Sequence, residues 1–151
     1  MVETYWKKFL ETGNNRQTYS DRFHTAWHFC DNKDDADKLA ELVLAGTKRG
    51  TAGMVESYKA ENEPLPKPGD LSIILNWTGI PQCIIETVKV WSWTFDDVPA
   101  WFAAIEGEGD GSLEYWKKVH REAFGREAVE IDIDFTDETM VVCEEFRVVC
   151  F

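Results

Sequence analysis

The chain has 151 residues, of which 44% are hydrophobic and 13% aromatic; this is enough for one compact core and excludes an intrinsically disordered chain. Sixteen basic residues against 28 acidic ones give a formal net charge of −12, so we expect no binding to duplex DNA or to an anionic membrane. No signal peptide or membrane-spanning stretch is recognisable and the four cysteines are scattered, which favours a cytoplasmic, single-domain protein with reduced thiols.

The N-terminal part of the chain contains two predicted helices. Apolar residues recur at helical spacing over residues 2–11, and we expect residues 1–25, this helix and an extended segment, to pack on a core formed by residues 26–151. The second helix is predicted from about residue 32 to residue 45, because acidic residues favour its first turn and an apolar stripe follows one face. Gly46 comes next and is expected in the left-handed conformation that ends many helices.

The rest of the chain mixes strands and helices. Apolar, β-branched runs predict strands, and a glycine-rich loop joins two predicted helices. The expected elements are a short strand and a helical piece within 51–63, strands over 71–75 and 83–90, helices over 96–105 and 112–124, and strands over 130–135 and 140–151. Because strands and helices do not alternate regularly, this order predicts an α+β domain built around a small curved sheet or barrel.

The connection between the second helix and the next strand carries a candidate nucleophile. A turn through Arg49 and Gly50 would bring the ammonium of Lys48 beside the hydroxyl of Thr51, although a regular strand would point them to opposite faces. A lysine beside a threonine can activate the hydroxyl or polarise a carbonyl, provided that burial keeps the amine partly neutral. The alternative is a solvated loop, since short connections commonly contain glycine, lysine and threonine.

An acidic loop precedes the helix predicted at 112–124. In it Glu106, Glu108 and Asp110 alternate with glycines, and one of these carboxylates can act as a general acid or base or accept a hydrogen bond from a nucleobase amino group. The alternative is that Asp110 or Ser112 caps the helix while both glutamates are solvated. No histidine is adjacent in the sequence, so we expect no metal ion and no other cofactor here.

Aromatic residues offer a further way to bind a base. Trp77 lies near a predicted strand end and can stack on a base if it faces a cleft, whereas most of the other tryptophans are expected in the core. His120 belongs to the apolar stripe of the helix at 112–124, which favours a hydrogen-bonded position at the edge of the core over a catalytic one.

The pattern G-x-K-x-x-T, present as Gly46, Lys48 and Thr51, resembles the signature of the ASCH family, small domains related to the PUA-like RNA-binding barrel. The similarity continues through residues 61–70 and through the Glu-Gly-Glu-Gly-Asp loop into the following helix, and it spans the chain from about residue 26 to the C-terminus. This resemblance implies a PUA-like small β-barrel with flanking helices, and a cleft that binds RNA, a nucleotide or a modified nucleoside.

The activity that the resemblance implies is not uniform. One bacterial branch hydrolyses the amide of N4-acetylcytidine with a lysine, a threonine and a glutamate, another member resembles a ribonuclease, and many have no assigned activity. Lys48 and Thr51 match the first two catalytic positions, and Glu108 is the best match for the third, with Glu106 as the alternative. The residues expected to bind substrate around them are Gly46, Arg49, Trp77 and Asp110.

Three functions follow as hypotheses. In a hydrolase acting on a small nucleoside-like substrate, Thr51 attacks an acyl carbonyl, Lys48 accepts its proton and Glu108 assists the leaving group; an acidic protein suits such an uncharged ligand. In a non-catalytic module, Lys48 and Arg49 contact the phosphates of a short single-stranded RNA or a nucleotide. In a ribonuclease, Lys48 stabilises the phosphorane and a glutamate activates the 2′-hydroxyl.

Overall fold

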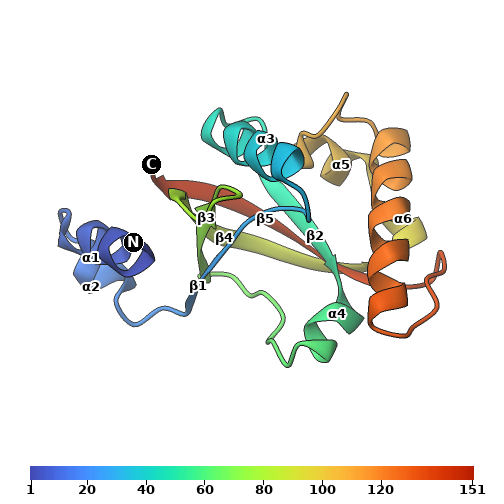
Figure 1. Ribbon diagram of the computed structural model, residues 1–151, viewed down its shortest axis with the longest axis horizontal. Helices are drawn as coiled ribbons and strands as arrows, with labels where there is room; N and C mark the ends of the chain where they lie inside the picture. Colours follow the sequence, from blue (N-terminus) through green and yellow to red (C-terminus); the bar gives the residue numbers. More distant parts are fainter.

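A five-stranded sheet, curled into a half-barrel, forms the centre of the computed structural model, which describes residues 1–151 (Figure 1). The strands are β1 (His24–Trp27), β2 (Gly50–Met54), β3 (Leu71–Leu75), β4 (Pro81–Thr94) and β5 (Met140–Cys150). Their order in the sheet is β1-β3-β4-β5-β2, in which β1 runs parallel to β3 and all other neighbours are antiparallel. Because β1 and β2 are both edges, the half-barrel stays open on one side.

Helices cover the sheet and its ends. They are α1 (Val2–Glu11), α2 (Asn15–Tyr19), α3 (Lys33–Leu44), α4 (Val55–Ala60), α5 (Ala100–Glu106) and α6 (Leu113–Glu130), with a 3₁₀ turn, η1 (Phe95–Asp97), after β4. The first two helices lie at one end of the molecule and α6 at the other, with the sheet between them (Figure 1). None of the helices combines the length and the apolar character that crossing a bilayer requires.

Three apolar clusters hold these layers together. The first joins α5 and α6 to β5, the second joins α3 to the middle of the sheet, and the third joins α1 to β3 and β4. Each fully buried large apolar side chain contributes about 1.5–3 kcal/mol relative to an exposed one. Representative members are Phe102, Trp116 and Cys143 in the first, Val43, Ile85 and Phe146 in the second, and Phe9, Leu71 and Ile73 in the third. All four cysteines are free thiols, and Cys83 and Cys143 are buried.

The α+β class and the PUA-like architecture predicted from the sequence are confirmed. The second predicted helix is α3: Asn32 caps it by accepting a hydrogen bond from the Asp35 backbone N–H at 2.9 Å, and Gly46 follows with a φ of 79°. The helix predicted over 96–105 is interrupted, because Pro99 fixes its own φ, lacks an N–H and keeps the preceding Val98 extended.

The prediction of a strand over residues 130–135 is wrong. Helix α6 continues to Glu130, and the following residues form an irregular segment in which Asp132 has a φ of 59° and the Ile133 N–H donates to the Ala128 carbonyl. Ile131, Ile133 and Phe135 still pack against the first apolar cluster. Alternating apolar residues require only that every second side chain faces the core, which an irregular segment also achieves.

Candidate functional site

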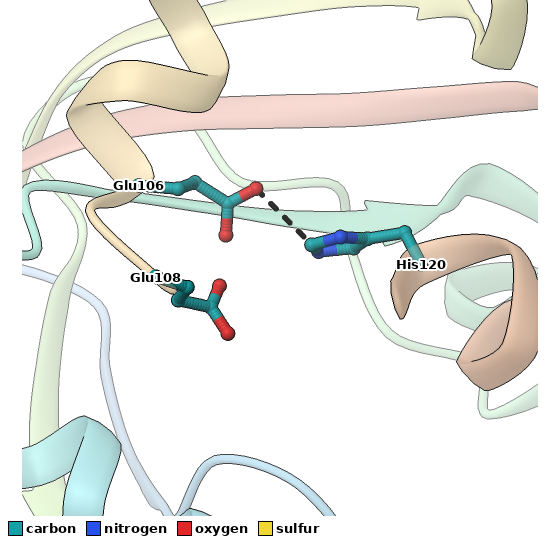
Figure 2. Close-up of side chains that lie close together, drawn as sticks. All are labelled: Glu106, Glu108 and His120. Carbon is teal, nitrogen blue, oxygen red and sulfur yellow. Dashed lines mark ion pairs between the residues drawn. The ribbon is translucent and has the colours of Figure 1, made fainter. Parts of the chain in front are cut away.

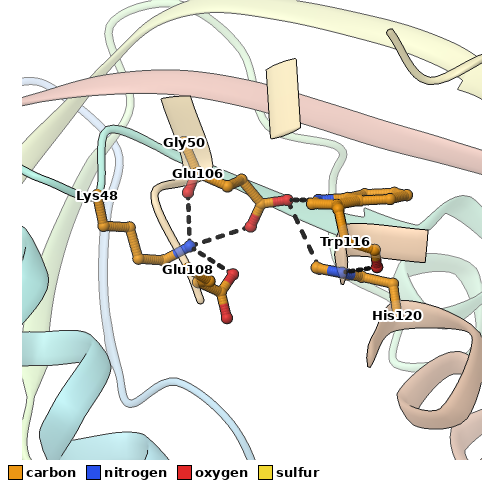
Figure 3. A network of polar contacts seen from close by, with 6 residues as sticks. All are labelled: Lys48, Gly50, Glu106, Glu108, Trp116 and His120. Atoms are coloured by element: carbon orange, nitrogen blue, oxygen red, sulfur yellow. Dashed lines mark hydrogen bonds and ion pairs between the residues drawn. The ribbon is translucent and has the colours of Figure 1, made fainter. Parts of the chain in front are cut away.

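Lys48 lies at the centre of a buried polar cluster (Figure 3). Only 1% of the residue is exposed, and its ammonium donates three hydrogen bonds: 2.7 Å to the Gly50 carbonyl oxygen, 3.0 Å to Glu106 Oε1 and 3.2 Å to Glu108 Oε2. An ammonium has three protons, so every donor of Lys48 is used. The lysine and both glutamates of the sequence prediction therefore converge on one point.

Two glycines shape the backbone around this cluster. Gly46 ends α3 in the left-handed conformation and turns the chain toward β2. Gly107, between the two glutamates, has a φ of 66°, and a Cβ there would overlap the carbonyl oxygen of Thr47. The acidic loop can approach the lysine segment this closely only because residue 107 has no side chain.

The second carboxylate oxygen of Glu106 contacts α6. Oε2 accepts a hydrogen bond from the indole N–H of Trp116 and lies 3.5 Å from His120 Nε2 (Figure 3). The other ring nitrogen of His120, Nδ1, lies 2.9 Å from the Trp116 carbonyl oxygen, and since a carbonyl only accepts, Nδ1 is the donor. His120 therefore joins the polar cluster as well as the edge of the core.

The cluster separates the protonation states of its members. Burial alone would lower the pKa of Lys48, but the charges of Glu106 and Glu108 outweigh it and hold that pKa above its ordinary value. Burial raises the pKa of Glu106, yet Lys48, His120 and the Trp116 hydrogen bond together bring it below its usual range. The pKa of Glu108 is raised by burial and by the charge of Glu106. Lys48 thus remains an ammonium and Glu106 a carboxylate, and of the two glutamates Glu108 protonates more readily.

The same residues include a set of potential metal ligands. Glu106, Glu108 and His120 offer ligand atoms that all lie within 4.8 Å of one another (Figure 2). The sequence prediction considered only neighbours along the chain, whereas the fold brings His120 from α6 to the acidic loop. Two carboxylates and an imidazole suit a divalent transition metal, but Lys48 already supplies a positive charge between the two carboxylates.

A cavity of about 490 Å³ lies on the inner face of the half-barrel, lined by residues from all five strands and from α4 and α6. Thr51 is part of its wall. The wall contains no lysine or arginine but five carboxyl side chains, which belong to Glu61, Glu63, Asp70, Glu127 and Glu144. Such a wall repels phosphate groups and favours a neutral or cationic ligand.

The polar cluster and the cavity meet at Phe29. Its ring centroid lies 5.1 Å from Lys48 Nζ, and both Phe29 and Cys30 belong to the cavity wall. From the other direction, Lys48 binds the carbonyl oxygen of Gly50, the residue directly before Thr51. Lys48, Glu106 and Glu108 do not line the cavity themselves. The catalytic residues predicted from the sequence are therefore divided between the cavity wall, which contains Thr51, and the adjoining polar cluster, which contains the other three.

The residues predicted to bind substrate do not line the cavity. Gly46 shapes the end of α3, and Arg49 is exposed. Trp77 is 39% exposed and packs edge-on against His28, which is a wall residue. Asp110 accepts a hydrogen bond from the Ser112 backbone N–H at 2.9 Å, and Ser112 caps α6, as the capping alternative expected, but Glu106 and Glu108 are not solvated as that alternative required.

Glu144 is a buried carboxyl that sequence reasoning did not single out. It is 7% exposed, accepts a 2.8 Å hydrogen bond from Thr87 Oγ1, and lies opposite Thr51 in the pairing of β2 with β5. Burial raises its pKa to about 7. Glu144 and Glu145 are adjacent in the sequence, and only the position of the strand in the sheet shows which of them faces the cavity.

Comparisons with known proteins agree with this fold. A crystal structure of an ASCH domain from Lactobacillus crispatus JV V101 superimposes with a TM-score of 0.92 and 34% identity, covering 99% of this chain and 94% of that one. The crystal structure of a protein from Enterococcus faecalis V583 gives a TM-score of 0.87 and 32% identity over 99% of this chain and 88% of that one. The comparison with curated proteins gave no match.

The half-barrel with its flanking helices defines a PUA-like α+β domain. The family model described as the ASCH domain matches residues 25–150, and the chain therefore belongs to the ASCH domain family. Membership of this family fits a module that binds RNA or a nucleotide.

Proposed function

We propose that this ASCH domain hydrolyses an acylated amino group on a small nucleoside-like substrate bound in the inner cavity. The observation that carries the proposal is the position of Thr51, which lies in the wall of an acidic cavity and directly follows Gly50, whose carbonyl oxygen binds the buried Lys48 ammonium. A hydroxyl nucleophile next to a fixed positive charge is the arrangement that acyl transfer requires.

The charge of the cavity favours a nucleoside over a phosphorylated ligand. Five carboxyl groups without a lysine or arginine would repel each phosphate of an RNA strand, whereas a nucleoside carries no charge. A volume of about 490 Å³ falls within the range typical of small-molecule sites. The cavity therefore supports the hydrolase more strongly than the ribonuclease hypothesis.

The protonation state of Lys48 changes the role expected for it. Its raised pKa keeps it charged, so it does not accept the proton of Thr51 as the sequence-based hypothesis required. Lys48 does not line the cavity, so as an ammonium it stabilises negative charge on the acyl oxygen of the tetrahedral intermediate where that oxygen reaches past Phe29 to the polar cluster. All three of its donors are in use, and the bond to Glu108 is the longest of the three, so this is the partner that an oxyanion replaces most easily.

Glu108 supplies the proton for the leaving amine. Its side chain is 16% exposed against 2% for Glu106, and its pKa is raised where that of Glu106 is lowered. Two carboxyls with pKa values driven apart commonly divide into an acid and a permanent anion. The geometry thus supports Glu108 as the proton donor and Glu106 as the anion that keeps Lys48 charged.

The test is the release of acetate from N4-acetylcytidine, followed by chromatography. Thr51→Val keeps the shape of the side chain and removes its oxygen, so we expect turnover to be lost while the fold is retained; Thr47→Val, at an exposed threonine, is the matched control. We expect Glu108→Gln to lower the rate more than Glu106→Gln.

A different result would assign the other function. If the wild-type protein shows no turnover but binds a short single-stranded RNA or a nucleotide, and Lys48→Ala weakens that binding, the domain is a non-catalytic binding module. If Thr51→Val is as active as Thr47→Val, the threonine is not the nucleophile.

A further inference from the structure

The environment of Glu144 is that of a functional carboxyl. It projects from the central part of β5 into the cavity wall and is 7% exposed. Its one side-chain hydrogen bond comes from Thr87 to Oε1, so Oε2 has no partner within the protein. Carboxyl groups this buried are normally paired with a cation, yet no lysine or arginine contacts Glu144.

Thr51 is the cross-strand neighbour of Glu144. The two residues are directly opposite in the antiparallel pairing of β2 with β5, and both belong to the cavity wall. Side chains at directly opposed positions share one face of the sheet, with Cβ atoms about 4.5–5.5 Å apart. A carboxylate oxygen and a hydroxyl on such a pair can meet directly or through one water molecule.

We propose that Glu144 accepts the proton of the Thr51 hydroxyl in the hydrolysis, an inference that rests on the function proposed above. As Thr51 Oγ1 bonds to the acyl carbon, its proton passes to Glu144 and the carbonyl electron pair moves onto oxygen beside Lys48. The intermediate collapses, the carbon–nitrogen bond breaks, and the amine leaves with the proton of Glu108. A water molecule then gives its proton to Glu108 and its hydroxide to the acyl carbon; the bond between that carbon and Thr51 Oγ1 breaks, and Glu144 returns its proton to Thr51 as the free acid leaves.

The groups facing Glu144 explain why it suits this step. Asp70, from the turn before β3, raises its pKa, whereas Thr87 on β4 and the more distant Lys48 lower it. Tyr58 of α4 lies near enough that the charge of Glu144 contributes to the raised pKa of the phenol, which therefore stays neutral. A pKa of about 7, set mainly by burial, is the value at which a general base works best near neutral pH.

The experiment compares the pH profile of kcat/KM for acetate release in the wild type and three variants. We expect the wild-type rate to fall below about pH 7 as Glu144 becomes protonated. Glu144→Gln should lower kcat by about 100-fold or more with KM within about threefold. Thr87→Val removes the hydrogen bond that lowers the pKa of Glu144, so the acidic limb should move to higher pH.

Glu145→Gln is the matched control, because this neighbouring carboxyl does not belong to the cavity wall. Turnover by Glu144→Gln equal to that of Glu145→Gln would overturn the role of Glu144 and leave the proposed function intact. Absence of turnover in the wild type would overturn both. If circular dichroism shows that Glu144→Gln does not fold, the pH profile of Thr87→Val provides the test. If the acidic limb of its kcat/KM profile stays at the wild-type pH, the inference is refuted.

Discussion

Replacing Lys48 by methionine tests how much the Lys48 ammonium stabilises the fold by neutralising the buried carboxylates. Methionine keeps much of the apolar stem and removes the ammonium, so Glu106 and Glu108 lose their shared cation in a site where their side chains are 2% and 16% exposed. Removing one partner of a buried ion pair costs about 3–5 kcal/mol. Glu106 keeps the Trp116 donor and His120, which limits the loss. We therefore expect the free energy of unfolding to fall by about 3 kcal/mol near neutral pH, at the lower end of this range.

The pH dependence of this loss identifies its cause. Without the ammonium, burial raises the pKa of both carboxyls above their values in the unfolded chain, so the folded variant binds protons more tightly than the unfolded one. Its stability then increases as the pH falls, whereas in the wild type the lowered pKa of Glu106 contributes stability that is lost on acidification. The difference between the two proteins should therefore shrink from neutral pH toward the ordinary pKa of glutamate.

Urea unfolding followed by circular dichroism at several pH values measures this difference. The control is Lys59→Met, which removes a lysine from an exposed pair with Glu56 and should change the stability by about 0.5 kcal/mol or less. A loss below about 1 kcal/mol for Lys48→Met, or a loss that does not depend on pH, would refute the view that Lys48 neutralises two buried carboxylates.

Three further predictions concern the backbone and the surface. Gly46→Ala should lower the free energy of unfolding by about 1 kcal/mol, because only the left-handed backbone conformation disfavours alanine there. Gly107→Ala should lower it clearly more, because the added Cβ also overlaps the Thr47 carbonyl oxygen. Equal losses of stability in thermal unfolding would contradict this. Ser112→Ala removes the N-cap of α6, whose hydroxyl accepts a hydrogen bond from the Tyr115 N–H at 3.1 Å. It should lower the free energy of unfolding by about 1 kcal/mol, and an unchanged midpoint in urea unfolding would rule out this capping role. Any affinity for single-stranded RNA should be weak because the net charge of −12 opposes it, and it should fall with rising salt because only contacts of lysine and arginine with phosphate can supply it; tight, salt-insensitive binding in fluorescence anisotropy would disprove this.

Features that depend on neighbouring residues were predictable from the sequence. Asn32 and Gly46 mark the ends of α3 because capping and the left-handed conformation are local preferences. The hairpin formed by β3 and β4 follows from two apolar runs and a short turn. The spacing of Lys48 and Thr51 pointed to the family, and the family model matches residues 25–150.

Local patterns failed where tertiary packing decided the outcome. Apolar alternation over 130–135 predicted a strand, but the segment packs on the core without pairing. Similarly, nothing in the sequence relates His120 to Glu106, because His120 Nε2 comes within 3.5 Å of Glu106 Oε2 only in the folded chain. The choice between Glu144 and Glu145 depends on the register of β5 between β4 and β2.

The charges of the site were also decided by the fold. From the sequence, Lys48 is a lysine that burial could neutralise, and Glu106 and Glu108 are two equivalent acids in a loop. The structure places one ammonium between both carboxylates and leaves Glu144 without a cation, so Lys48 stays charged while the pKa of Glu144 rises to about 7. Residue types and their order determine which groups can react, but their pKa values depend on burial and on charges brought together from distant segments.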